Sequence, residues 1–171
     1  FWIQLKVQEQ QAKGIRLKDM PEEWFRMPAD DEMRNSVIAT IGVFACNRLM
    51  DMQSFEEANK LMAHFLKIES GIVGFYRSLL TCDRMYCELI DGNKEAAAKL
   101  FTKEQQKFMK SMKKFLAVLR TEYAYALLCE SDFSKAEAIK RKFEKCARAY
   151  PYPSEIESER ELMRIADKQA F

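Results

Sequence analysis

Glycine and proline are scarce in this sequence, with five Gly and four Pro among 171 residues. Because tight turns depend on these two residue types, little room is left for a turn-rich β fold. Alanine, leucine, lysine, glutamate and methionine are common instead, and all five favour helix. The proportions, 48% hydrophobic and 32% charged residues, are those of a globular protein. The composition therefore predicts an all-α fold.

The sequence also lacks the cysteine pattern of a disulfide framework. Its five cysteines are odd in number, have no C-x-x-C spacing, and each lies in an apolar, helix-like context. Buried thiols in a reducing compartment are the simplest interpretation, which favours a cytoplasmic location. The cysteines are Cys46, Cys82, Cys87, Cys129 and Cys146.

Residues that carry chemistry are few. His64 is the single histidine, and neither a G-x-S-x-G elbow nor a Gly-rich phosphate loop occurs. We therefore expect no catalytic residue, cofactor or metal in this domain. No apolar run is long enough to span a membrane. The net charge of +2 and the absence of a recognition motif argue against nucleic acid as a partner.

Apolar residues recur at spacings of three and four, which predicts about eight amphipathic helices in one helical-repeat domain over 1–171. We expect the end of a preceding helix at 1–13, an ordered connector at 14–30, helical hairpins at 31–149 and a capping helix at 154–170. Expected first-turn caps are Asp30 or Asp31, Ser54 with Glu57, Asn93, Thr102 with Gln105, and Ser154 with Glu157.

One segment of the sequence recurs in similar form. "SFEEANKLMAHF" begins at Ser54 and "DFSKAEAIKRKF" begins at Asp132, 78 positions later. Halfway between them, Ala97 matches Ala58 and Ala136. A helical hairpin recurring about every 39 residues is typical of an α-solenoid.

The small residue at Ala58, Ala97 and Ala136 suits a close helix crossing, and we expect Phe55 and Phe133 to pack at the turn. The pattern resembles degenerate tetratricopeptide repeats, so the predicted fold is a tetratricopeptide-like α-solenoid of antiparallel hairpins. An ordinary helical bundle would give the same stripes and stays open as the alternative.

Two surface features are candidates for binding. Basic residues from Lys103 to Arg120 and from Lys135 to Arg148 could merge into a positive face that attracts acidic peptides or anionic lipid, or could be a solvated surface. The concave surface of a solenoid would present a mildly basic groove for a protein or peptide partner. The candidate groove residues are Arg34, Asn35, Asn47, Arg48, Arg77, Arg84, Arg120 and Tyr123.

Five segments carry a resemblance to a known family: "FWIQLKVQEQQAKGIRLKDMPEEWF", "GVFACNRLMD", "TKEQQKFMKSMKKF", "LRTEYAYALL" and "YPYPSEIESERELM". Together they resemble the soluble C-terminal region of site-two-protease-like membrane zinc metallopeptidases from Gram-positive anaerobic bacteria. In that family the zinc-binding H-E-x-x-H helix lies in a transmembrane portion, which this sequence does not contain.

The resemblance implies a non-catalytic protein-binding or regulatory appendage, tethered to the membrane through a region upstream of Phe1. It implies no catalytic residue in this domain. A free-standing tetratricopeptide-like adaptor and a small-molecule sensor with an apolar pocket are the alternatives. The sequence before Phe1 distinguishes the protease appendage from the free-standing adaptor.

Overall fold

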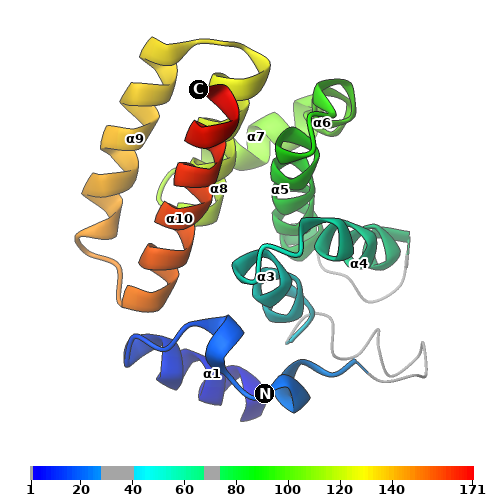
Figure 1. Cartoon of the computed structure of the whole chain (residues 1–171), viewed down its shortest axis with the longest axis vertical. Coiled ribbons are helices and arrows are strands. Elements are labelled where there is room, and N and C mark those ends of the chain that lie inside the picture. The colour runs from blue at the N-terminus through cyan, green and yellow to red at the C-terminus, as the bar shows by residue number, and fades with distance from the viewer. Residues whose placement is uncertain (1, 28–40, 68–73) are drawn as a thin grey trace. The chain divides into compact units, whose positions relative to one another are not determined.

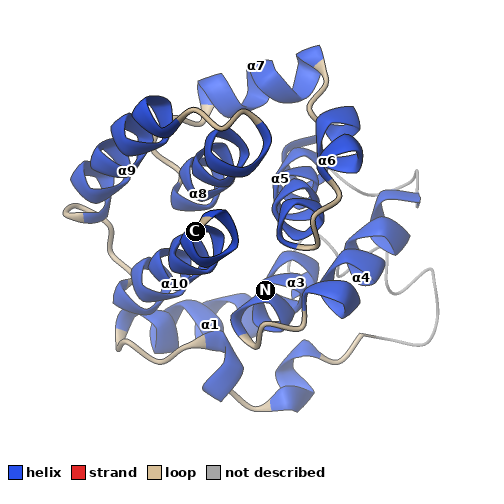
Figure 2. Cartoon of the chain, turned by 45° about the horizontal axis from the view of Figure 1, so that its top comes forward, coloured by secondary structure: helices blue, strands red, loops and turns tan. Residues whose placement is uncertain are grey.

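The computed structural model describes residues 2–27, 41–67 and 74–171, and it is all-helical in those ranges (Figures 1 and 2). The predicted fold class is therefore confirmed at the level of an all-α protein. The described helices are α1 (Trp2–Ala12), α3 (Val43–Asp51), α4 (Phe55–Lys67), α5 (Gly74–Ile90), α6 (Lys94–Leu100), α7 (Lys103–Ser111), α8 (Leu116–Ala124), α9 (Phe133–Ala147) and α10 (Pro153–Ala170).

Three shorter helical segments complete the described chain. The connector, predicted to be ordered, holds two 3-10 turns, Leu17–Asp19 and Glu22–Phe25. A π-helical turn, Tyr125–Cys129, follows α8 directly. The described chain divides into two compact units. Unit 1 is Phe1–Leu80 with Tyr152–Glu155, and unit 2 is Thr81–Pro151 with Ile156–Phe171.

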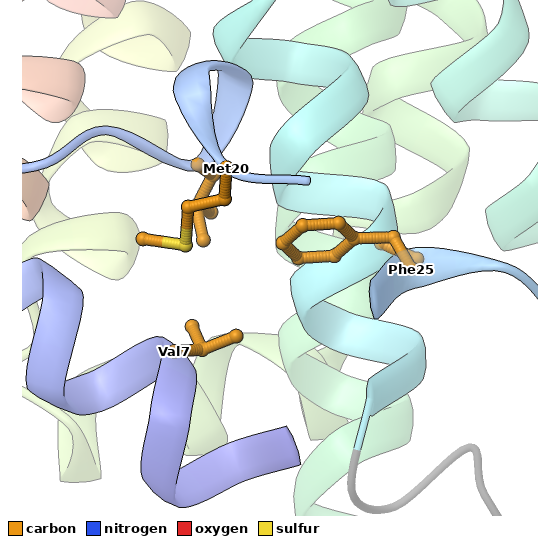
Figure 3. Close-up of a cluster of buried hydrophobic side chains, with 5 residues drawn as sticks. Val7, Met20 and Phe25 are labelled. Carbon is orange, nitrogen blue, oxygen red and sulfur yellow. The ribbon is translucent and has the colours of Figure 1, made fainter. Parts of the chain in front are cut away.

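The core of unit 1 is an apolar cluster that draws on α1, the connector and α3. Val7, Leu17, Met20, Phe25 and Ala45 are its buried members. Figure 3 shows the side chains of Val7, Met20 and Phe25 converging on one another. The ordered connector predicted from its aromatic residues is thus part of a core, because the burial of Met20 and Phe25 holds it in place.

A buried carboxylate fixes the connector to α3. The guanidinium of Arg16 donates two hydrogen bonds to Asp51, one of them from Nε at 2.9 Å. The backbone N–H of Lys18 donates to the second carboxylate oxygen at 3.1 Å. Asp51 therefore neutralises a charge and satisfies a backbone donor at the first 3-10 turn.

Unit 2 is built around the hairpin of α8 and α9, which pack against each other. Figures 1 and 2 both show α8, α9 and α10 side by side. Asp132 caps α9 by accepting from the Lys135 N–H at 3.0 Å, and Thr102 caps α7 by accepting from Gln105 at 3.2 Å. The Thr102 cap was predicted from the sequence and is confirmed, whereas the Asp132 cap is a finding of the structure.

Two pairs of positions at the 78-residue offset are buried in both copies. Ala58 and Ala136 are buried, as predicted, and so are Phe65 and Phe143. Ala97, at the halfway offset, is buried too. Two hairpins exist in the described chain, α3–α4 and α8–α9. Superposition of these hairpins and a solenoid arrangement stay predictions.

Three local predictions are wrong. Phe133 is 53% exposed and its ring lies 5.7 Å from that of Phe171 between centroids, so it does not pack into the turn. Ser154 lies inside α10, which begins at Pro153, and its hydroxyl donates to the Gln11 carbonyl at 3.2 Å in place of capping with Glu157. Asn93 precedes α6 without a side-chain cap, because its amide donates to Glu88 at 3.0 Å. The cap expected at Asp30 or Asp31 lies outside the described residues.

Candidate partner-binding site

The most buried charge in unit 2 is the guanidinium of Arg120, on α8. Its side chain is 1% exposed and lies between carboxylates from two other helices. Arg120 Nη2 donates to Asp83 of α5 at 2.6 Å, and Nε donates to Glu159 of α10 at 2.7 Å. Nη1 donates to Thr121 Oγ1 at 2.8 Å. The Tyr86 ring lies 4.9 Å from the guanidinium carbon. We call Arg120, Asp83 and Glu159 the ionic cluster.

The ionic cluster holds two carboxylates against one guanidinium. Burial would lower the pKa of Arg120, but Glu159 and Asp83 outweigh it and raise that pKa, so the arginine is always charged. Burial raises the pKa of Asp83, Arg120 opposes this, and the nearby Glu159 raises the pKa further. Asp83 thus resists ionisation, first because it is buried and also because Arg120 must balance the charge of Glu159 as well.

Two tyrosines anchor the rest of α10. Tyr86 donates from its hydroxyl to the Leu162 carbonyl at 2.7 Å. Tyr123 hydrogen-bonds to Asp167 one helical turn further along. Burial raises the pKa of both hydroxyls far above the physiological range, so both remain donors. Together with Glu159, these contacts fix α10 at three successive points.

The structure corrects two residues of the predicted groove. Arg120 and Tyr123 are buried in unit 2 and bonded to other helices, so neither can line an open groove. Both fall on the apolar face of α8, where the packing of neighbouring helices covers them. Arg34 and Asn35 lie outside the described residues.

The other four predicted residues belong to different units. Asn47 and Arg48 of unit 1 are half-buried, and the Arg48 guanidinium lies 5.4 Å from the Phe25 ring centre. Arg77, also in unit 1, donates to the Leu66 carbonyl at 3.1 Å. Arg84, in unit 2, approaches Glu88 at 3.9 Å. Three of the four therefore make contacts within their own unit.

A different surface of unit 2 gathers unpaired positive charge. A hollow of about 610 Å³ lies beside the α8–α9 hairpin, and four lysines line it without any acidic residue. We call it the lysine groove. Its lining residues are Lys113, Lys114, Phe115, Lys142, Lys145, Cys146, Ala149 and Tyr150.

Two short segments shape the lysine groove. Lys142, Lys145 and Cys146 share one face of α9, because they are spaced by three and four residues. The turn that precedes α8 supplies Lys113, Lys114 and Phe115, and the Phe115 N–H donates to the Met112 carbonyl at 3.1 Å. Ala149 and Tyr150, just after α9, complete the lining. Phe115 is 38% exposed, which places an aromatic side chain where a visiting molecule can reach it.

The four lysines of the groove form no salt bridge within the part of the chain that the structure describes. All four are exposed. The other lining side chains are mostly apolar, and we call Phe115, Ala149 and Tyr150 the apolar floor. A hollow that combines apolar side chains with ammonium groups can bind a molecule that carries both apolar and acidic groups.

Neither a metal-binding group nor a membrane-spanning helix occurs among the described residues. They contain no group of three or more His, Cys, Asp and Glu residues placed to hold a metal ion. None of their helices is long and apolar enough to cross a membrane.

Comparison with known proteins gives no relative from which a site could be transferred. No family model, no curated protein and no solved structure matches this chain.

Sequence reasoning missed the ionic cluster although a signal was present. Glu159 lies among several glutamates near the start of α10, where capping and solvation are the simplest interpretation of carboxylates. It precedes the buried Leu162, Met163 and Ala166 by three, four and seven residues, so it lies on their apolar face. A carboxylate on an apolar face predicts a buried cation opposite it, and Arg120 has the same placement on α8.

Proposed function

We propose that this domain is a non-catalytic binding module and that its lysine groove holds an acidic, amphipathic segment of a partner protein. The observation that carries the proposal is that one hollow combines an apolar floor with four lysines that form no salt bridge among the described residues. This keeps the general function expected from the sequence, a protein- or peptide-binding module, and moves the docking surface to α9 and the turn before α8.

Charge supports the proposal. Lysines on a solvated surface usually have acidic neighbours, and Lys13 and Lys60 illustrate this by pairing with Glu9 and Glu56 at 2.6 Å. In the lysine groove no lining residue is acidic. Four like charges near one another repel, so a partner that brings carboxylates relieves repulsion as well as forming ion pairs.

The apolar floor supplies the part of the binding that charge alone does not. An anchor such as a phenylalanine or leucine gains about 1.5–3 kcal/mol when fully buried. Aromatic residues are frequent anchors of protein interfaces, and Phe115 and Tyr150 provide two rings against which an anchor can pack. We therefore expect a partner segment with one large apolar residue flanked by glutamates or aspartates.

The test uses a fluorescent peptide with one phenylalanine flanked by glutamates, titrated with the protein and followed by anisotropy. The groove variant is Lys113→Glu/Lys145→Glu. The matched control is Lys94→Glu/Lys99→Glu, which makes the same charge change at two exposed lysines of α6. We expect the groove variant to weaken binding roughly tenfold or more, and the control to change it far less, because exposed charges beyond about 8 Å are screened at physiological salt.

Three results would overturn the proposal. Absence of binding to the wild-type protein would show that the groove does not hold such a segment. Equal weakening by both variants would show general charge attraction only. Tighter binding to vesicles rich in anionic lipid than to the peptide, lost in the groove variant, would make the groove a membrane-contacting surface instead of a protein-binding one.

The parent chain is also a matter of proposal. The five segments quoted above support an origin as the C-terminal appendage of a membrane zinc metallopeptidase, tethered in the cytoplasm. The coding sequence upstream of Phe1 tests this directly. Transmembrane runs with H-E-x-x-H are the expected result, and an initiator methionine close to Phe1 would select a free-standing adaptor.

A further inference from the structure

A second hollow of unit 2, of about 360 Å³, has a different character from the lysine groove. Its apolar wall comes from Phe101, Met109, Tyr125 and Ile139, and its polar wall includes Lys110 and Glu122. We call it the glutamate hollow. It lies among α7, α9 and the end of α8, and no residue of it belongs to the lysine groove.

The aromatic wall is defined by a ring contact and by an irregular backbone. The rings of Phe101 and Tyr125 lie 4.5 Å apart between centroids, tilted by 54°. Tyr125 begins the π-helical turn that ends α8. Such turns are rare and frequently occur at functional sites, because the extra residue redirects the side chains around it. Gln106, which also lines the hollow, donates to the Phe101 carbonyl at 3.1 Å.

Of the four charged residues that line the glutamate hollow, two form a salt bridge with each other and two do not. Lys135 and Glu130 pair with each other at 2.7 Å, so they cancel. Glu122 and Lys110 form no salt bridge in the part of the chain that the structure describes. Burial raises the pKa of Glu122, and Lys142 and Lys135 oppose it. A half-buried carboxylate outside any ion pair gains from a ligand that brings a positive charge.

We propose that the glutamate hollow binds a small zwitterion with an apolar body, of the class of aliphatic and aromatic α-amino acids. Glu122 receives the ammonium group, Lys110 receives the carboxylate, and the apolar body packs on Phe101, Met109 and Ile139. The volume lies within the range usual for small-molecule sites. This binding is independent of the lysine groove and does not rest on the function proposed for it.

The test uses leucine and phenylalanine as probes at millimolar concentration, observed by ligand-detected NMR and by calorimetry. Two altered ligands separate the two charges: leucinamide lacks the carboxylate and N-acetylleucine lacks the ammonium. We expect both to bind at least roughly tenfold more weakly than leucine, because each leaves one protein charge without its partner.

Protein variants separate the same two contacts. Glu122→Gln should abolish leucine binding and Lys110→Met should weaken it. The matched controls are Glu137→Gln and Lys107→Met, exposed residues of α9 and α7 that do not line the hollow. The groove variant Lys113→Glu/Lys145→Glu should bind leucine normally. Circular dichroism melts of every variant verify that the fold is intact.

Each alternative outcome contradicts the inference in a defined way. If none of the four ligands binds, the hollow is not an amino-acid site. Leucinamide binding as tightly as leucine would show that only the ammonium is recognised. Binding unchanged in Glu122→Gln would place the ligand elsewhere on the protein.

Discussion

The ionic cluster and the lysine groove both gather charged side chains within unit 2. They differ in burial and in whether the chain supplies the opposite charge. Arg120 is 1% exposed and its donors reach Asp83, Glu159 and Thr121. Lys142 and Lys145, on α9, are exposed, and no salt bridge involving them occurs among the described residues. The charge of Arg120 is therefore balanced by carboxylates of the same chain, whereas Lys142 and Lys145 face solvent or a partner.

This difference separates stability from binding. A buried ion pair is costly to break, because removing one partner leaves an uncompensated charge away from water. Exposed lysines contribute little to stability, because water and salt already screen them. We therefore expect substitutions in the ionic cluster to change folding, and substitutions in the lysine groove to change binding while leaving folding intact.

The largest expected effect is that of Arg120→Met. It removes the cation and leaves Asp83 and Glu159 buried without a counter-charge, which should lower the free energy of unfolding by about 3–5 kcal/mol. Urea unfolding followed by circular dichroism measures this. Lys145→Met is the control and should change the free energy of unfolding by less than about 0.5 kcal/mol. Equal effects would erase the distinction between the two regions.

A triple variant sharpens the same comparison. Arg120→Met combined with Asp83→Leu and Glu159→Leu replaces the ionic cluster by apolar side chains of similar size. Because no charge is left buried, most of the stability lost in Arg120→Met should return. A triple variant as unstable as the single one would mean that the helices need the geometry of the cluster, not merely its neutrality.

The next effect in size concerns Ala136, which is buried in the hairpin that carries the lysine groove. Ala136→Leu should overpack the contact of α9 with α8 and cost about 1–3 kcal/mol. Ala138→Leu, on the exposed side of α9, makes the same change and should be nearly neutral. Thermal melts of the pair measure the difference. Identical melting temperatures would place Ala136 outside the packed contact.

The smallest expected effect is a pH dependence at Asp83. Its pKa is raised by burial and by Glu159, so between its unfolded value, about 3.9, and its folded value the native state holds more protons. The stability that Asp83 contributes is therefore present below about pH 4 and is lost as pH rises through the folded pKa. Asp83→Asn keeps a hydrogen-bond acceptor for Arg120 and removes this titration.

The measurement is the free energy of unfolding of both proteins from pH 4 toward neutrality. We expect Asp83→Asn to gain stability relative to the wild type as pH rises over that window. A constant difference would show that Asp83 does not titrate there. A difference of the opposite sign would show that Arg120 lowers the pKa of Asp83 more than burial raises it.

Much of the fold could be predicted from sequence because its signals are local. Helix periodicity, the cap at Thr102, and the small residues Ala58 and Ala136 depend on neighbours within a few positions. The failures at Ser154 and Asn93 have one cause. Each side chain found a better partner outside its own first turn, Gln11 for Ser154 and Glu88 for Asn93.

The candidate site was predictable only in part. The lysines of the groove were recognised as part of a basic face, since they recur at helical spacing. Which of them surround an apolar floor depends on how the turn at Phe115 meets α9, and spacing does not determine that. Arg120 was predicted to line the groove because arginine is a frequent anchor of interfaces. Its burial depends on carboxylates 37 and 39 positions away in sequence.

The most direct test of the central claim is lysine acetylation followed by mass spectrometry, with and without a saturating acidic peptide. If the lysine groove keeps its cations for a partner, Lys113, Lys114, Lys142 and Lys145 should react several-fold more slowly when the peptide is bound. Lys94 and Lys99 of α6 should react at unchanged rates. Protection spread evenly over all six lysines, or none at the four of the groove, would contradict the account.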